Sequence, residues 1–219
     1  MRLGWEAAAA TDVGRVRAGN EDTFLIDARR GVFLVADGMG GHAAGEVASA
    51  LATTAVGEAL RTGVDAGLQA DALAAAMVAS FRRANRAIQD FSAAHPETAG
   101  MGTTMTALAL CDDGTFRVAH IGDSRMYVLR HGELHQVTRD HTWVQQEVDS
   151  GRLTAAGARR HHLGSVLTRA LGADHDEPEV FVGTLLPDDL VLLATDGLTG
   201  MLSDRLLRRV LDRPATPAE

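Results

Sequence analysis

The stretch VFLVADGMGGH occupies residues 32–42 and runs from five apolar residues straight into Asp-Gly. A short apolar run that ends in this way is typical of a buried strand followed by a turn. The pattern returns as VLLATDG at residues 191–197, and a related form, VAHIGDS, occupies residues 118–124. One Asp-Gly pair by itself indicates only a turn, but the repetition indicates that Asp37, Asp123 and Asp196 share a role.

A carboxylate at a strand end is held firmly by the sheet and still faces solvent. The glycine after it, Gly38 or Gly197, lets backbone, or a metal bound to its carbonyl, approach closely. Because no cluster of cysteine or histidine accompanies these aspartates, the pattern favours Mg²⁺ or Mn²⁺ over zinc.

The surrounding sequence alternates long helical stripes with short strands. Residues 71–93 carry apolar side chains every three or four positions, which predicts a helix with one buried face, Asp71 as its N-cap and Pro96 beyond its end. A second helix is predicted at 44–61, a helical region at about 140–160, and a short helix from a Ser203 cap to about residue 211. The predicted strands are residues 23–28, 32–36, 103–110, 115–121, 125–130, 134–138 and 191–195. This order predicts an α+β layered domain with much antiparallel sheet.

The length and charge limit the classes of function. The 219 residues fit one domain, predicted at residues 1–212, with 213–219 as a tail or linker. The formal charge of −8 argues against broad nucleic-acid binding. No apolar stretch reaches the roughly 18 residues of a membrane span, and the first residues lack a signal-peptide core. With a single cysteine, Cys111, the chain is expected to be soluble and cytoplasmic.

Five ordered motifs carry a family resemblance: RAGNED, VADGMGGH, GTT, IGDS and TDGL, at residues 17–22, 35–42, 102–104, 121–124 and 195–198. Together they resemble the protein phosphatase 2C family in its bacterial form, over roughly residues 11–211. The resemblance implies a four-layer α/β/β/α sandwich around a central antiparallel β-sandwich, with the metal site at one end.

The resemblance also implies roles for the metal ligands. Asp37 would bridge two Mn²⁺ or Mg²⁺ ions, with the Gly38 carbonyl on one of them and Asp196 on the other. Asp123, together with Asp196, would hold a weaker third ion.

The same resemblance assigns roles around the ions. Asp22 and Glu21 would hold metal-bound water, and Arg17 would clamp the substrate phosphate, a task that suits its planar fork of donors. His42 is a candidate general acid, because the family's eukaryotic histidine is replaced by Met39; His42 is equally well explained as a residue at the start of a helix.

The implied activity is hydrolysis of phosphoserine and phosphothreonine on proteins, by metal-activated water and without a covalent intermediate. The expected partners are phosphorylated proteins and a cognate bacterial Ser/Thr kinase.

One family motif is not found. The family pattern ends in an Asp-Asn pair, but the two asparagines, Asn20 and Asn85, both precede Asp196. The domain is therefore expected to be C-terminally incomplete, through truncation, through natural loss, or because another chain supplies the strand. The alternative function is a catalytically impaired, phosphatase-like regulatory or binding protein.

Two other patterns suggest sites that the residues do not favour. Cys111 and Arg117 match the Cys-x5-Arg spacing of cysteine-dependent phosphatases, but the adjacent aspartates disfavour the thiolate that such enzymes need. His161 and His162 lie in a stretch, about residues 140–165, that would match the family's substrate-selecting flap. Adjacent histidines on a polar loop are more often solvated than bound to metal.

Overall fold

The larger layer of this computed structural model, which describes residues 4–40, 44–68, 70–174 and 176–212, is a six-stranded antiparallel sheet. Its hydrogen-bonded order is β1-β2-β4-β5-β8, and the short β3 pairs with β2. The strands are β1 (Asp22–Asp27), β2 (Val32–Met39), β3 (Gly102–Thr103), β4 (Met105–Leu110), β5 (Thr115–Ile121) and β8 (Glu179–Thr184).

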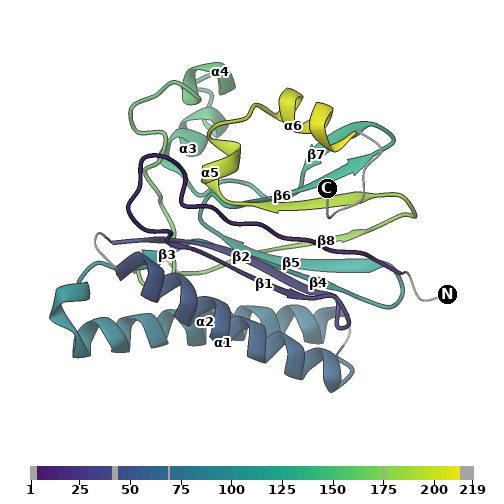
Figure 1. The fold of residues 1–219 in the computed structure, drawn as a ribbon, viewed down its shortest axis with the longest axis horizontal. Helices are drawn as coiled ribbons and strands as arrows, with labels where there is room; N and C mark the ends of the chain where they lie inside the picture. Colours follow the sequence, from purple (N-terminus) through teal and green to yellow (C-terminus); the bar gives the residue numbers. More distant parts are fainter. Residues whose placement is uncertain (1–3, 41–43, 69, 175, 213–219) are drawn as a thin grey trace.

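A smaller sheet faces the first one (Figure 1). In the described part of the chain it has three strands in the order β7-β6-β9: β7 (Glu133–Gln136), β6 (Arg125–Arg130) and β9 (Leu190–Ala194). Phe116 and Val118 of the larger sheet pack against Met126 and Val128 of β6. This apolar contact forms the interior of a β-sandwich.

Helices cover both outer faces of the sandwich (Figure 1). The long helices α1 (Ala44–Asp65) and α2 (Ala70–Ala94) lie on the larger sheet, where Val32, Leu34 and Ala36 of β2 join them in one buried cluster. The remaining helices are η1 (Pro96–Thr98), α3 (Trp143–Asp149), α4 (Ala155–Ala158), α5 (Asp196–Thr199) and α6 (Asp204–Leu211). The predicted α+β four-layer sandwich is confirmed. None of the helices in the described ranges is long and apolar enough to cross a membrane.

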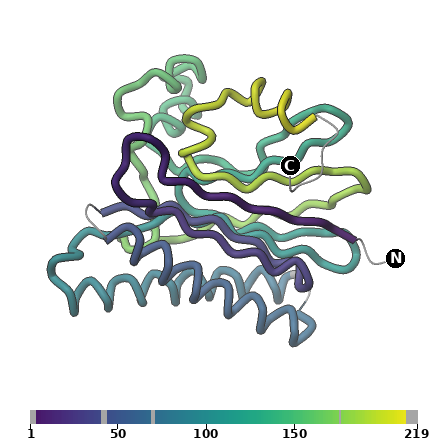
Figure 2. Tube along the Cα trace, viewed as in Figure 1, coloured from purple at the N-terminus to yellow at the C-terminus, as the bar shows by residue number. Residues whose placement is uncertain are grey.

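In the tube view the N-terminal segment runs alongside the sandwich and reaches the turn before β1 (Figure 2). Residues 213–219, predicted as a tail, and His42 lie outside the described residues.

Most predicted elements are present, with three corrections. Asp71 is not an N-cap, because α2 already includes Ala70 and Asp71 lies in its first turn. The region 140–160 is not one helix: α3 gives way at Ser150, and Gly151 adopts a φ of 74° that a helix cannot continue. Strand β8 was not predicted at all. Ser203 occupies the N-cap of α6, but its side chain makes no capping hydrogen bond.

Candidate functional site

Two of the acidic residues face each other across the β1–β2 pair. Asp22 and Asp37 are direct partners in the antiparallel register, so their side chains leave the same face of the sheet. Asp37 lies four residues after Phe33 on β2, so both side chains point to the same face of the sheet, and Phe33 packs between the two sheets. Both carboxylates therefore lie at the open end of the space between the sheets.

The smaller sheet brings a third carboxylate to this end. Asp196 follows β9 and begins α5. The Thr195 hydroxyl donates a hydrogen bond to Asp22 Oδ2 at 3.0 Å, which ties the end of β9 to the start of β1. The carboxyl groups of Asp37 and Asp196 are close enough to share a hydrogen bond. Three residues far apart in the sequence thus meet at one end of the sandwich.

Asp123 approaches from the end of β5. The preceding Gly122 has a φ of 98°, a left-handed conformation that favours glycine. A Cβ on Gly122 would lie 2.5 Å from Cγ2 of Thr104, so the turn also depends on the missing side chain. The charge of Asp196 helps to raise the pKa of Asp123, which places Asp123 within electrostatic reach of the other acids.

The four aspartates form a cluster of like charge. Burial, and then the charges of Asp196 and Asp22, raise the pKa of Asp37 to about 8. Burial, and then the charges of Asp196 and Asp140, raise the pKa of Asp123 to about 7.

The pKa of Asp22 is raised by burial as well, although the Thr195 hydrogen bond partly offsets this. A site that holds protons so tightly stabilises any cation that can replace them.

The backbone around Asp37 is held by two threonines. Thr104 Oγ1 accepts the Asp37 N–H at 2.9 Å, and Thr103 Oγ1 donates to the Asp37 carbonyl at 2.9 Å. The Gly38 N–H donates to the Glu21 carbonyl at 3.1 Å. The Gly-Thr-Thr motif is part of the family resemblance, but the sequence alone assigns these threonines no role; two adjacent hydroxyls beside a strand end were the available signal.

Arg17 stands at the edge of the acidic cluster. Its side chain is 75% exposed, and Nη1 lies 3.1 Å from Oε2 of Glu21. An ion pair so open to solvent contributes little to stability. The guanidinium is therefore free to turn its remaining donors toward an incoming anion.

The donor set fits hard divalent cations. All the clustered side chains are carboxylates, the ligands that Mg²⁺ and Mn²⁺ prefer. Across the described ranges, no three histidine, cysteine or acidic side chains surround one common point as in a closed site. A cation here would take one or two carboxylates and complete its coordination with backbone oxygen, water or substrate, as Mg²⁺ commonly does.

The histidine pair lies outside this cluster. The rings of His161 and His162 stack 4.6 Å apart, and His161 also lies 5.1 Å from the ring of Trp143. His161 Nδ1 accepts the N–H of Leu163 at 3.2 Å. Its contacts are local packing against α3.

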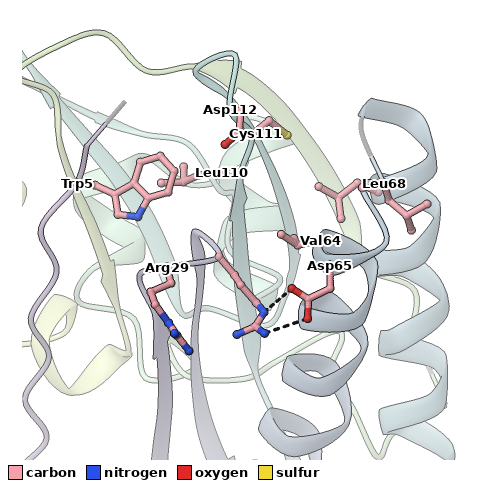
Figure 3. Close-up of a pocket in the computed structure, with 11 residues that line it drawn as sticks. Trp5, Arg29, Val64, Asp65, Leu68, Leu110, Cys111 and Asp112 are labelled. Carbon is pink, nitrogen blue, oxygen red and sulfur yellow. Dashed lines mark hydrogen bonds and ion pairs between the residues drawn. The ribbon is translucent and has the colours of Figure 1, made fainter. Parts of the chain in front are cut away.

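A pocket of about 230 Å³ lies at the opposite end of β2, beside the turn that precedes Val32 (Figure 3). Trp5, Leu68 and the ion pair of Arg30 with Asp65 line it, together with Cys111. The Cys111 side chain is buried in the turn after β4. None of the four clustered aspartates lines this pocket. Cys111 therefore lies apart from the acidic site.

A comparison with protein families accounts for this arrangement. The profile described as Protein phosphatase 2C matches residues 15–216. The chain belongs to the protein phosphatase 2C family. The four aspartates at the end of its sandwich lie within the matched region.

Named relatives of this protein phosphatase 2C domain are bacterial. It is 41% identical over 207 residues to the serine/threonine protein phosphatase PstP of Mycobacterium tuberculosis, a match that covers 94% of this chain and 39% of PstP. It is 34% identical over 213 residues to the serine/threonine phosphatase stp of Listeria monocytogenes, covering 95% of this chain and 84% of that protein.

Solved structures agree with the fold. The crystal structure of M. tuberculosis PstP/Ppp superposes with a TM-score of 0.87 at 41% identity, covering 96% of this chain and 86% of that one. A second structure, the PstP catalytic domain in complex with two manganese ions, gives a TM-score of 0.84 at 39% identity, covering 96% of this chain and 85% of that one.

Proposed function

We propose that this protein phosphatase 2C domain hydrolyses phosphoserine and phosphothreonine in proteins, with Mn²⁺ or Mg²⁺ as cofactor. The observation that carries the proposal is the convergence of Asp22, Asp37, Asp123 and Asp196, from both sheets, on one end of the sandwich. Similarity to bacterial serine/threonine phosphatases, one of them solved with two manganese ions, supports the substrate class and the metal.

The geometry supports a division of roles among the acids. Asp37 would be the ligand shared by two ions, because it lies against Asp196 on one side and opposite Asp22 on the other. The Gly38 carbonyl and Asp196 would each bind one of the two ions, and Asp123, with Asp196, would hold a third. Asp22 and Glu21 orient water at the site.

Bound there, the ions would lower the pKa of a shared water and neutralise charge that develops on the phosphoryl oxygens. Arg17 binds and orients the phosphate through its exposed guanidinium, which its weak ion pair with Glu21 leaves free to turn. His42 is the proposed proton donor to the leaving oxygen. Water attacks directly, since the buried Cys111 lies at the other end of β2 and no protein nucleophile is required.

We further propose that the substrates are products of a Ser/Thr kinase in the same cell. A phosphothreonine peptide and a phosphotyrosine peptide of the same sequence, each with Mn²⁺ or with a chelator, test the substrate class. Release of phosphate from the phosphothreonine peptide only with Mn²⁺ is expected. The Cys111→Ser variant is expected to match wild type, because the thiol is remote from the cluster. Equal turnover in chelator would contradict a metal-dependent mechanism.

A regulatory or binding role is the second candidate, because the family's Asp-Asn pair is not found among residues 197–219. Its signature is Mn²⁺ binding, measured by calorimetry, without turnover of any phosphopeptide. Turnover of more than a few cycles per chain excludes it.

A further inference from the structure

A buried chain of polar contacts connects Asp37 to the turn that carries Asp123. Thr104 Oγ1, which accepts the Asp37 N–H, lies 2.7 Å from the Ser124 hydroxyl. The Ser124 carbonyl in turn lies 2.7 Å from Thr106 Oγ1. Thr106 and Ser124 are fully buried and Thr104 almost so, so none of these groups can turn to water instead.

The chain ends at a histidine that the proposed chemistry does not use. His120 is the cross-strand partner of Thr106 in the β4–β5 pair, and its Nδ1 lies 2.9 Å from Thr106 Oγ1. Its Nε2 lies 3.0 Å from the Arg139 carbonyl. The ring is fully buried.

Counting protons shows that these contacts compete. Three contacts each need one proton: the contact from Thr106 to Ser124, the contact between Thr106 and His120, and the contact from His120 to Arg139. The Thr106 hydroxyl supplies one, and a neutral imidazole supplies one more. An imidazolium would satisfy all three, but burial, and then the neighbouring His141, lower the pKa of His120 to about 3. One contact is therefore left without a proton near neutral pH.

Burial, and then His141, lower the pKa of His120 and keep its ring neutral, although the carbonyls of Arg139 and Gly122 favour the charged form. The centroid of the His141 ring lies 4.9 Å from that of His120, and the ring centroid of Phe181, on the neighbouring strand β8, lies 6.5 Å away. Glu179, the β8 partner of His120, is directed to His141 and Arg169 instead, at 3.4 Å from each. Arg125 disfavours a further positive charge.

The burial of Ser124 and the length of its contact with Thr106 indicate where the Thr106 proton lies. The Ser124 carbonyl belongs to a residue with no exposed surface, so losing its donor leaves a buried acceptor unpaired, at a cost of about 1–3 kcal/mol. The 2.7 Å separation is also the normal length of an O–H···O bond. Thr106 therefore donates to Ser124, and His120 must donate to Thr106 from Nδ1.

His141 holds the other side of the same turn. Its backbone N–H donates to the Gly122 carbonyl at 2.7 Å, and its Nδ1 accepts the Gly122 N–H at 3.2 Å. Because Nδ1 is an acceptor, the proton of His141 is on Nε2, toward Glu179. Two histidines in ring contact thus carry their protons on opposite nitrogens, and Asp123 lies between the two peptides that they hold.

We propose that Thr106 and His120 are positioning residues for the acidic site: an Nδ1-protonated His120 directs the Thr106 hydroxyl to the Ser124 carbonyl and so fixes Asp123 relative to Asp37. The inference rests on the proposed metal-dependent function, since its consequence is the geometry offered to the cation. Residues that support ligands in this way commonly change metal affinity or activity by about 10–100-fold.

The test compares Thr106→Val, Thr106→Ser and Thr53→Val. Valine keeps the shape of threonine and removes the hydroxyl; serine keeps the hydroxyl. Thr53 is the matched control, a buried threonine on α1 whose hydroxyl has no hydrogen-bond partner among the described residues. The readouts are the Mn²⁺ concentration for half-maximal turnover of a phosphothreonine peptide and the Mn²⁺ affinity by calorimetry. A loss of folded protein lowers the amplitude but does not move either midpoint.

Thr106→Val is expected to weaken Mn²⁺ binding at least tenfold, while Thr106→Ser and Thr53→Val stay within about threefold of wild type. Unchanged Mn²⁺ affinity in Thr106→Val overturns the proposal even if the enzyme is active. A wild-type chain that binds Mn²⁺ without turnover fails the proposed function but leaves the affinity comparison valid. Nitrogen-15 shifts of the imidazoles give an independent readout: Nδ1–H at His120 and Nε2–H at His141 are expected, and Nε2–H at His120 overturns the assignment.

Discussion

Asp37 is the residue on which the account of the site depends. The sheet register places it opposite Asp22, and the end of β9 places Asp196 against it. Burial and these two charges raise its pKa to about 8, so the metal-free folded chain binds a proton there that the unfolded chain releases near pH 4. Without a bound cation, the ionised Asp37 carboxylate lowers the stability of the folded chain.

The raised pKa of Asp37 predicts the direction of a pH effect on stability. Between about pH 4 and pH 8 the folded state holds more protons at Asp37 than the unfolded state, so the free energy of unfolding falls as pH rises through that window. In chelator, the Asp37→Asn variant is expected to lose much of this slope and to have a Tm roughly 2–4 °C higher than wild type at pH 8. Urea unfolding from pH 5 to pH 9 measures the slope, and thermal unfolding at pH 8 measures the Tm; a wild-type stability that rises across this range would contradict the raised pKa.

At the residue scale the sequence foretold the strand-end aspartates well, because an apolar run ending in Asp-Gly has a local signature. It could not foretell that Asp22 pairs directly with Asp37, since register depends on how β1 and β2 meet. Nor could it foretell the roles of Thr104 and Thr106, which depend on contacts to residues 67 and 18 positions away.

At the scale of elements, α1 packs against the end of β2 with almost no clearance. A Cβ on Gly38 would lie 2.0 Å from the Gly45 carbonyl oxygen in the first turn of α1. Neither atom can move without shifting a strand or a helix. This close approach fixes the backbone that carries Asp37 relative to the helix.

Gly38→Ala is therefore expected to lower the free energy of unfolding by about 1–3 kcal/mol, the usual cost of overpacking. Gly197→Ala is the matched control in the other Asp-Gly motif, because its Cβ would meet only Thr195 Oγ1 at 3.6 Å. It is expected to be neutral or slightly stabilising. Chemical denaturation of both variants in chelator measures the difference, and equal stabilities would refute the tight packing.

The strand that the sequence failed to predict, β8, shows the limit of local patterns. Its residues EVFVGT include a charged residue and a glycine, and Val182 is 63% exposed, so there is no clean alternation of apolar and polar positions. The strand forms because β5 offers it six partners in register. Tertiary pairing, not propensity, determines this element.

At the scale of the whole molecule, the site exists only because two sheets are packed face to face. β1 and β2 supply Asp22 and Asp37, and the end of β9 supplies Asp196 from the other sheet. The α+β class followed from the order of elements, and the four-layer arrangement followed from the family resemblance. The face-to-face placement of strand ends from different sheets is a property of packing, which no local pattern shows.

Because the site joins both sheets, cation binding should stabilise the sandwich as a whole. Mn²⁺ at 100 times its dissociation constant adds about 2.7 kcal/mol, which corresponds to a Tm increase of roughly 5–10 °C for a chain of this size. The Asp37→Asn variant should show little of this increase. Calorimetric unfolding with and without Mn²⁺ measures it, and an equal increase in both proteins would place the cation elsewhere.

The most direct test of the central claim is the rate of phosphate release from a phosphothreonine peptide across a Mn²⁺ titration, for wild type and Asp37→Asn in parallel. The account predicts saturable, Mn²⁺-dependent turnover in wild type and a loss of at least about a hundredfold in the variant at every Mn²⁺ concentration. Equal rates in the two proteins would show that the aspartate at the centre of the cluster does not carry the chemistry.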